Sequence, residues 1–420
     1  MYFIYTSILY ALVPFVLLRL LWLSRKTPAY RQRWLERFGY VDSLVSEKKV
    51  IWIHAVSVGE IHASKPLVEF IRSHFMDYQL LITTVTPSGA ATAGKIFAGS
   101  VQHRYFPYDL PFAVSRFLET VKPHILLILE TEIWPNLYRQ CRKSNIPILL
   151  LNARLSARSL KGYQMVKALT ASTLEDTTVI AAQSTPDAER FIQAGAPADK
   201  LMVMGNLKFD ISIAPSVIEQ AEVLRRIFSV NRPIWIAAST HLGEELIVLD
   251  AMELVLNVAP DILLILVPRH PERFDDVYDL CVKQGFKTAS YTNQSAYGPK
   301  TQVFVLDVLG QLPAYYAASD VAFVGGSLIP IGGHNLLEPA CLGLPIVCGT
   351  HLFNFYEISS LLGDVDALFK VADAEQLSQR ILELFNDGNL RYNMGQRAKQ
   401  VVMDNQGSIN RIGKLLQQYI

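Results

Sequence analysis

The sequence contains few cysteines, and none of them is placed to form a metal or redox site. The four are Cys141, Cys281, Cys341 and Cys348, and they form no CxxC pair and no Cys/His cluster at metal-ligand spacing. We interpret them as small core residues of a protein kept in a reducing compartment. The cysteines therefore point to neither a disulfide framework nor a metal centre.

The sequence also lacks an excess of charge of either sign. Its formal net charge is +1, 18% of its residues are charged, and half are hydrophobic. The near-zero balance gives no electrostatic footprint for nucleic acid, and the apolar content excludes disorder. A chain of 420 residues is long enough for two domains of ordinary size. We therefore expect two packed domains and no nucleic-acid partner.

Two common phosphate-binding motifs are absent. No G-x-G-x-x-G follows a strand-like run, which disfavours a dehydrogenase, and no G-x-x-x-x-G-K-[ST] is present, which excludes a P-loop. Asp364 and Asp366 have the form of a metal-binding pair, but they lie far from the other polar candidates, so we interpret them as part of a loop. We therefore expect no metal cofactor.

The N-terminus is strongly apolar and is followed by basic residues. Residues 1–18 carry no charged side chain, and after Arg19 the apolar run resumes. Positive charges that follow an apolar run predict a membrane anchor over residues 1–24, with the later domains on the cytoplasmic side. Arg19 and Pro14 leave an interfacial helix possible, and the alternative is a hydrophobic helix packed on the domain. The basic residues of the flank are Arg25, Lys26, Arg31, Arg33 and Arg37.

From residue 49 onward, apolar runs alternate with helical spacing. The runs are continuous rather than alternating, which is typical of parallel strands buried on both faces. The expected strands of the first half are 50–54, 80–85, 124–129, 147–151, 177–182 and 201–204. Those of the second half are 234–238, 262–267, 303–306, 321–324 and 345–347.

Two successive series of this kind predict an α/β fold with two doubly wound, Rossmann-like domains that face one another. The expected boundaries are an N-terminal domain over 25–210, a linker over 211–231 and a C-terminal domain over 232–420. Amphipathic helical segments from 374 to 419 end the second domain.

A glycine-rich segment in the second half is the most informative stretch. Residues 325–339 follow an apolar run and contain four glycines, which permit tight turns and close approach to a ligand. Asn335 is placed to cap a short helix, with Glu338 three residues later, close to a capping-box pattern. A glycine loop that leads into a helix N-terminus is a candidate anion site, which suggests a nucleotide-type donor.

Ligands of open α/β sheets bind beyond the carboxyl ends of strands, so we examined the polar residues there. Glu60 is a candidate general base or a first-turn glutamate that offsets the helix dipole. Glu130 is a candidate catalytic group or a loop anchor, and the sequence does not separate it from Glu132. Lys208 could neutralise developing negative charge or be solvated on a linker. Arg269 suits a phosphate, or a surface ion pair.

Seven features taken together resemble one known family, the Kdo (3-deoxy-manno-octulosonate) transferases of Gram-negative lipopolysaccharide synthesis. The resemblance covers essentially the whole chain. The features are the N-terminal anchor, HAVSVGE (54–60), ETEIWPN (130–136), NARLS (152–156), GNLKFD (205–210), PRHPER (268–273) and GGHNLLEP (332–339).

The resemblance implies a GT-B glycosyltransferase that moves Kdo from CMP-Kdo to a lipid A precursor, lipid IV-A, at the inner face of the inner membrane. It implies that Glu60 accepts the proton of the acceptor hydroxyl and that Glu130 and Lys208 stabilise the transition state. No cofactor or metal is implied. The residues that match the CMP-binding segments are Pro268, Arg269, Leu309, Gly310, Gln311, Asn335, Leu336, Leu337 and Glu338.

One position departs from the family pattern, and two other functions remain open. Gln311 stands where a glutamate is common, so donor contact there is more plausible than a charged role. A GT-B transferase or epimerase that acts on a UDP-sugar is the first alternative, and a catalytically inactive membrane scaffold of the same fold is the second.

Overall fold

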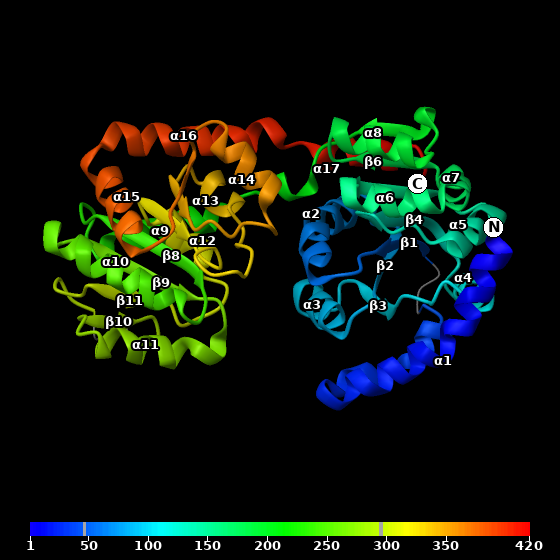
Figure 1. Ribbon diagram of the computed structural model, residues 1–420, viewed down its shortest axis with the longest axis horizontal. Helices are drawn as coiled ribbons and strands as arrows, with labels where there is room; N and C mark the ends of the chain where they lie inside the picture. The colour runs from blue at the N-terminus through cyan, green and yellow to red at the C-terminus, as the bar shows by residue number, and fades with distance from the viewer. Residues whose placement is uncertain (45–47, 294–296) are drawn as a thin grey trace. The chain divides into compact units, whose positions relative to one another are not determined.

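The computed structural model describes residues 1–44, 48–293 and 297–420. It divides into two compact units (Figure 1). The first unit contains Met1–Asp210 together with Gln406–Ile420, and the second contains Ile211–Asn405. Each unit holds one seven-stranded sheet, so the expected pair of α/β domains is confirmed.

The sheet of the first unit is parallel, with strand order β3-β2-β1-β4-β5-β6-β7. Trp52 belongs to one hydrophobic cluster, and its neighbours Ile51 and Ile53 belong to another, so helices cover both faces. The strand order reverses between β1 and β4, which is where such sheets bind ligands. The strands are β1 (Lys49–His54), β2 (Tyr78–Thr84), β3 (Gln102–Tyr105), β4 (Pro123–Leu129), β5 (Ile148–Ala153), β6 (Val179–Ala182) and β7 (Leu201–Val203).

Nine α-helices lie in the described part of the first unit. They are α1 (Tyr2–Lys26), α2 (Val58–His74), α3 (Pro87–Phe97), α4 (Pro111–Val121), α5 (Pro135–Lys143), α6 (Ala157–Met165), α7 (Lys167–Glu175), α8 (Thr185–Ala194) and α17 (Ser408–Leu416).

The sheet of the second unit is also parallel, with order β10-β11-β9-β8-β12-β13-β14, and it reverses between β8 and β12. Its strands are β8 (Ile234–Thr240), β9 (Leu263–Pro268), β10 (Thr288–Ser290), β11 (Val303–Val305), β12 (Val321–Val324), β13 (Ile346–Cys348) and β14 (Leu368–Lys370). Its helices are α9 (Pro215–Phe228), α10 (Glu244–Val258), α11 (Phe274–Lys283), α12 (Leu312–Ala317), α13 (Leu337–Cys341), α14 (Tyr356–Gly363), α15 (Ala374–Asn386) and α16 (Gly388–Asn405).

The sequence patterns missed three strands, β3, β10 and β14, and all three lie at sheet edges. An edge strand has a neighbour on one side only, and these three are short and carry polar residues, as edge strands commonly do. They therefore lack the continuous apolar run by which the inner strands were found.

The units also differ from the expected boundaries at two places. Residues 211–231 are not merely a linker, because α9 packs on the second unit with Phe228 buried and Arg225 paired with Asp320. Residues 406–420 leave the second unit and complete the first. There Ile412 and Leu416 join the core that lies against α2.

Helix α1 is 25 residues long and apolar enough to cross a membrane. Only 6% of its most apolar window is buried inside the protein. Its first turns lie beside α5 (Figure 1). The remaining apolar surface of α1 is therefore available for lipid, as the expected anchor requires.

Candidate functional site

Glu60 lies at the start of α2, immediately beyond the carboxyl end of β1. Ser57 caps this helix by accepting a hydrogen bond from the Glu60 amide at 3.3 Å. In return, the Glu60 carboxylate accepts hydrogen bonds from the Ser57 hydroxyl at 2.9 Å and the Val56 amide at 2.8 Å. This reciprocal arrangement is close to a capping box. The helix-start interpretation of Glu60 is therefore correct, and it also fixes where the carboxylate lies.

The environment of Glu60 favours a proton acceptor that works near neutrality. The residue is only 7% exposed. Burial raises the pKa of its carboxyl to about 7, and the nearby negative charge of Glu130 adds to the rise. A carboxylate with this pKa is partly ionised at neutral pH and binds a proton more readily than an ordinary glutamate.

Glu130 follows β4, the strand beside β1 in the sheet. Its φ of +61° is left-handed, which is strained for a residue with a side chain. Its carboxylate lies 3.7 Å from the Lys208 ammonium, and both side chains are partly exposed. The ion pair brings together the two residues that the family resemblance assigns to the transition state.

Lys208 owes its position to a buried amide network. Asn152 has a left-handed φ of +54° and accepts a hydrogen bond from the Leu207 amide at 3.0 Å. Asn206 accepts one from the Lys208 amide at 3.0 Å and donates to Gln183 at 3.1 Å. These bonds hold the short 3-10 turn Leu207–Phe209, so Lys208 is not a freely solvated linker residue.

Glu132 is a third carboxylate beyond the end of β4, and no sequence pattern favours it over Glu130. Burial raises its pKa to about 7, and the charge of Glu60 adds to this rise. Its backbone carbonyl accepts a hydrogen bond from the Tyr138 hydroxyl at 2.8 Å, which holds the turn. Glu60, Glu130 and Glu132, with Lys208 beside Glu130, form what we call the acid cluster.

In the second unit, the glycine segment after β12 already holds an anion, and that anion belongs to the protein. The carboxylate of Glu244, at the start of α10, accepts hydrogen bonds from the amides of Gly326, Ser327 and Leu328 at 2.7 to 3.0 Å. Glu244 is fully buried. These three loop amides are therefore not available to a ligand anion, because Glu244 occupies them.

The end of the glycine segment is arranged around Asn335. Its side-chain oxygen accepts a hydrogen bond from the Leu337 amide at 3.1 Å, and its amide group donates to Glu338 at 3.0 Å. The N-cap of α13 is Leu336, so Asn335 holds the helix start from one residue earlier than expected, and Glu338 bonds the Asn335 side chain rather than its backbone. Gly332 has a left-handed φ of +108°, and an added Cβ there would overlap the Asn354 side chain.

Three histidines gather at the ends of β8 and β9 and in the glycine segment. The Nε2 atoms of His241 and His334 lie 2.7 Å apart, so one ring donates to the other. The ring of His270 lies 5.1 Å from that of His241. Burial lowers the pKa of His334 to about 4, and the charges of His241 and Arg269 lower it further. We call these residues the histidine cluster.

Arg269 lies next to both the histidine cluster and the glycine segment. It follows β9, and its amide donates to the Thr240 carbonyl at 2.9 Å. Burial raises the pKa of Glu338, while the Asn335 hydrogen bond and the positive charge of Arg269 oppose this rise. Pro268, Arg269 and residues 335–338 therefore lie together beyond the carboxyl ends of the strands in the second sheet.

Residues 309–311 form the turn before α12. Gly310 has a φ of +87°, Leu309 is exposed, and the Gln311 carbonyl accepts from the Ala314 amide at 3.1 Å. Because α12 packs against α13, this turn leads into the same part of the second unit as residues 335–338. Asp364 and Asp366 lie in the turn after α14, as expected for a loop.

Comparison with known proteins shows which family the whole chain matches. Residues 32–211 match the family described as 3-deoxy-D-manno-octulosonic-acid transferase (kdotransferase), and residues 231–401 match glycosyl transferases group 1. A 3-deoxy-D-manno-octulosonic acid transferase of Haemophilus influenzae is 40% identical over 420 residues, covering 100% of this chain and 98% of the relative. One from Bordetella pertussis is 31% identical, covering 99% of each chain. The chain belongs to the Kdo transferase family.

Membership of the Kdo transferase family makes the chain a glycosyltransferase and confirms the recognition from its motifs. Its fold resembles a UDP-GlcNAc 2-epimerase from Neisseria meningitidis, with a TM-score of 0.58, 14% identity, and coverage of 88% of this chain and 100% of that one. At that identity the likeness shows the fold alone, and it agrees with the expected GT-B architecture.

Three residues of this Kdo transferase were missed or left without a role by the sequence argument. Glu244 and its partner amides are separated by 82 to 84 residues, so no local pattern joins them. His241 is the residue directly after β8. A search for polar residues beyond the ends of strands would have found it if it had extended one residue further. Glu132 was named beside Glu130, but its raised pKa and the pairing of Glu130 with Lys208 depend on tertiary surroundings.

Proposed function

We propose that this protein transfers Kdo from CMP-Kdo to the lipid A precursor lipid IV-A, with inversion at the anomeric carbon. The observation that carries the proposal is the Glu60 carboxylate, which is buried, rigidly held and close to half-ionised at neutral pH. Its two hydrogen bonds leave about half of its lone pairs for a substrate hydroxyl.

In the proposed reaction, a hydroxyl oxygen of the acceptor forms a bond to the anomeric carbon of Kdo. The hydroxyl proton passes to Glu60, and the bond from that carbon to the CMP phosphate oxygen breaks, so its electron pair leaves with CMP. Glu130 and Lys208 are proposed to stabilise the transition state, the lysine by its positive charge. Protonated Glu60 then returns its proton to water.

The donor is proposed to bind the second unit. Arg269 is suited to the CMP phosphate because a guanidinium matches a phosphate with two parallel hydrogen bonds. The rings of the histidine cluster can add N–H donors. Glu338, held by Asn335, is proposed to accept hydrogen bonds from ribose hydroxyls, with residues 309–311 and 336–337 as further donor contacts.

The acceptor explains the anchor, and we propose that α1 attaches the protein to the inner membrane from the cytoplasmic side. The Tyr5 hydroxyl donates to buried Asp109 at 2.9 Å, and Thr6 donates to Asn136 at 3.0 Å. A helix whose first turns are tied to the domain favours an interfacial position over a full span. Arg25 and Lys26 in its last turn suit anionic lipid headgroups.

The position of α1 can be tested by labelling Phe3→Cys in intact cells with a maleimide that does not cross the inner membrane. An interfacial helix predicts no labelling from the periplasmic side. Labelling from that side would show that the helix spans the membrane.

The activity is tested with the full chain, CMP-Kdo and lipid IV-A in detergent micelles, with the product mass measured. We expect the acceptor to gain the mass of Kdo, and the mass also reports how many units are added. Transfer only from a UDP-sugar such as UDP-GlcNAc would favour the first alternative. No turnover of any donor would favour the inactive scaffold.

A further inference from the structure

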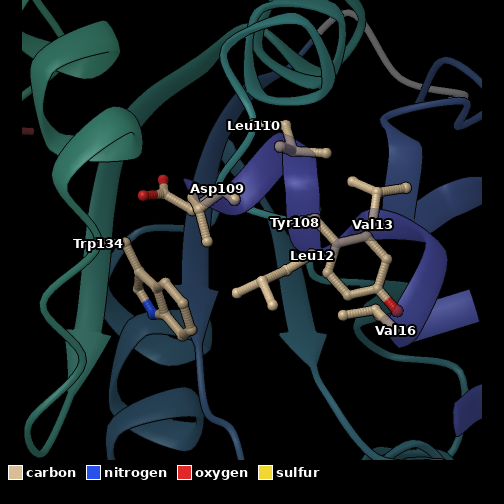
Figure 2. A pocket seen from close by; sticks show the side chains of 8 residues that line it. Leu12, Val13, Val16, Tyr108, Asp109, Leu110 and Trp134 are labelled. Atoms are coloured by element: carbon tan, nitrogen blue, oxygen red, sulfur yellow. The ribbon is translucent and has the colours of Figure 1, made fainter. Parts of the chain in front are cut away.

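We propose that a cavity between α1 and the first domain binds an acyl chain of the lipid acceptor. One wall is a stripe of α1, Leu9, Leu12, Val13 and Val16, and the facing wall includes Leu110 and Trp134 (Figure 2). The inference rests on the proposed function, since it takes a lipid as the acceptor, and it assigns that lipid a binding site on the protein.

The cavity is apolar even though Asp109 contributes to its lining. The Asp109 carboxylate is turned away from the α1 side chains Leu12, Val13 and Val16 (Figure 2). Both of its oxygens are used, because they accept hydrogen bonds from Tyr5 and from the amides of Asn136 and Leu137 at 2.7 to 3.0 Å. No unpaired charge of Asp109 therefore faces the cavity, and the other polar groups of its lining are the neutral Tyr108 hydroxyl and Trp134 indole nitrogen.

The size of the cavity fits a slim hydrocarbon rather than a sugar. Its volume is about 120 Å³. An apolar protein cavity of about 150 Å³ holds benzene, so this one has room for roughly five carbon atoms. Leu12 is 45% exposed, so the cavity opens to the surface beside it. A longer chain can therefore enter with one end while the rest stays in the membrane.

The position of Trp134 favours the acceptor over bulk membrane lipid. Trp134 follows the acid cluster residue Glu132 by two positions and is the N-cap of α5. The same short turn therefore lines the cavity and carries Glu130, which is proposed to act in the transfer, together with Glu132. A lipid whose chain fills the cavity has its headgroup close to that turn. The acceptor sugar must reach the turn to react, whereas a bulk phospholipid headgroup has no role there.

The test fills the cavity and asks whether only the acylated acceptor is affected. Val13→Phe is assayed with lipid IV-A and with the same disaccharide after its acyl chains have been removed. We expect the KM for lipid IV-A to rise about tenfold, which corresponds to losing the burial of roughly two methylene groups of the acyl chain. The KM for the deacylated acceptor should not change. If Val13→Phe does not fold, Leu12→Trp at the exposed rim replaces it.

Leu18→Phe is the matched control, because Leu18 is 64% exposed and lies on the opposite face of α1. It adds a similar volume outside the cavity and should change neither KM. Equal KM values for Val13→Phe and the wild type, or a rise with both acceptors, would overturn the proposal.

Photo-crosslinking separates the acceptor from bulk lipid. Lipid IV-A with a diazirine in one acyl chain should label the peptides of residues 9–16 and 134, and unlabelled lipid IV-A should compete. Uncompeted labelling by a diazirine phospholipid would show that bilayer lipid fills the cavity and would overturn the acceptor assignment. Binding is read here without turnover, so absence of Kdo transfer by the wild type would contradict only the proposed function.

Discussion

Glu60 and Glu244 occupy corresponding places in the two units and are used differently. Each is a buried carboxylate at the start of the helix that follows the strand beside the sheet's reversal point, β1 in one unit and β8 in the other. In the second unit, the strand on the other side of that point is β12, and three amides of the glycine loop after it donate hydrogen bonds to Glu244. Glu60 instead has Glu130 and Glu132 nearby. The loop after the neighbouring strand therefore decides whether such a carboxylate is structural or free to bind a proton.

The largest expected effect is on the rate of transfer when Glu60 loses its charge. Glu60→Gln keeps the shape and most hydrogen bonds of the cap but cannot accept the proton. We expect kcat to fall by about 10³-fold, in the range of general-base catalysis. The rate is measured by product mass with CMP-Kdo and lipid IV-A.

Glu69→Gln is the control, because Glu69 lies on the same helix and forms an exposed ion pair with Lys65. It should leave the rate unchanged. A Glu60→Gln enzyme with wild-type kcat would remove Glu60 from the proposed mechanism.

The corresponding change in the second unit should damage structure. Glu244→Ala leaves two buried loop amides and one part-buried amide without an acceptor, which we expect to cost about 3 kcal/mol locally. Hydrogen exchange of residues 321–338 measures the loss of protection. Glu253→Ala, at an exposed position of the same helix, is the control. Unchanged exchange in Glu244→Ala would show that the loop does not depend on this carboxylate.

A smaller effect is expected on donor binding from Arg269→Ala. Loss of a charge-assisted contact to phosphate corresponds to about 2 kcal/mol, or roughly a thirtyfold higher KM for CMP-Kdo. The KM for the acceptor should remain as in the wild type. Arg226→Ala, at an exposed position of α9, is the control. A rise in the acceptor KM alone would place Arg269 outside the donor site.

The smallest expected effect is a shift of the pH profile. Glu60 must be ionised to accept a proton, so kcat/KM should fall as the pH drops below about 7, the raised pKa of its carboxyl. The negative charge of Glu130 contributes to that rise. Glu130→Gln should therefore lower the pKa of Glu60 and move the midpoint to lower pH, whatever its effect on the maximal rate. A midpoint that moves to higher pH would contradict the coupling.

The sequence predicted the parts of the fold that are buried on both sides and missed those that are not. Inner strands such as β1 and β9 are continuous apolar runs, whereas the edge strand β3 reads Gln-His-Arg-Tyr. The amphipathic pattern of α17 predicted a helix with one buried face, but not that this face packs against α2. That choice depends on tertiary contacts, which a local pattern does not contain.

The same limit applies to the candidate site. Glu60, Glu130 and Lys208 were found because each follows an apolar run, and strand ends meet at one edge of a parallel sheet. Glu244 escaped because it satisfies amides more than 80 residues away. The different environments of Glu130 and Glu132 also depend on burial, which their positions two residues apart do not reveal.

The return of α17 to the first unit makes the second unit an insertion in the chain. The chain passes between the units near Asp210 and again near Gln406, and the second unit alone is continuous in sequence. During synthesis from the N-terminus, residues 211–405 are therefore complete before the first unit receives Ile412 and Leu416, its last core residues. The unit that carries α1 is therefore completed after the second unit, and its apolar contacts between α17 and α2 form only once residues 211–405 have been made.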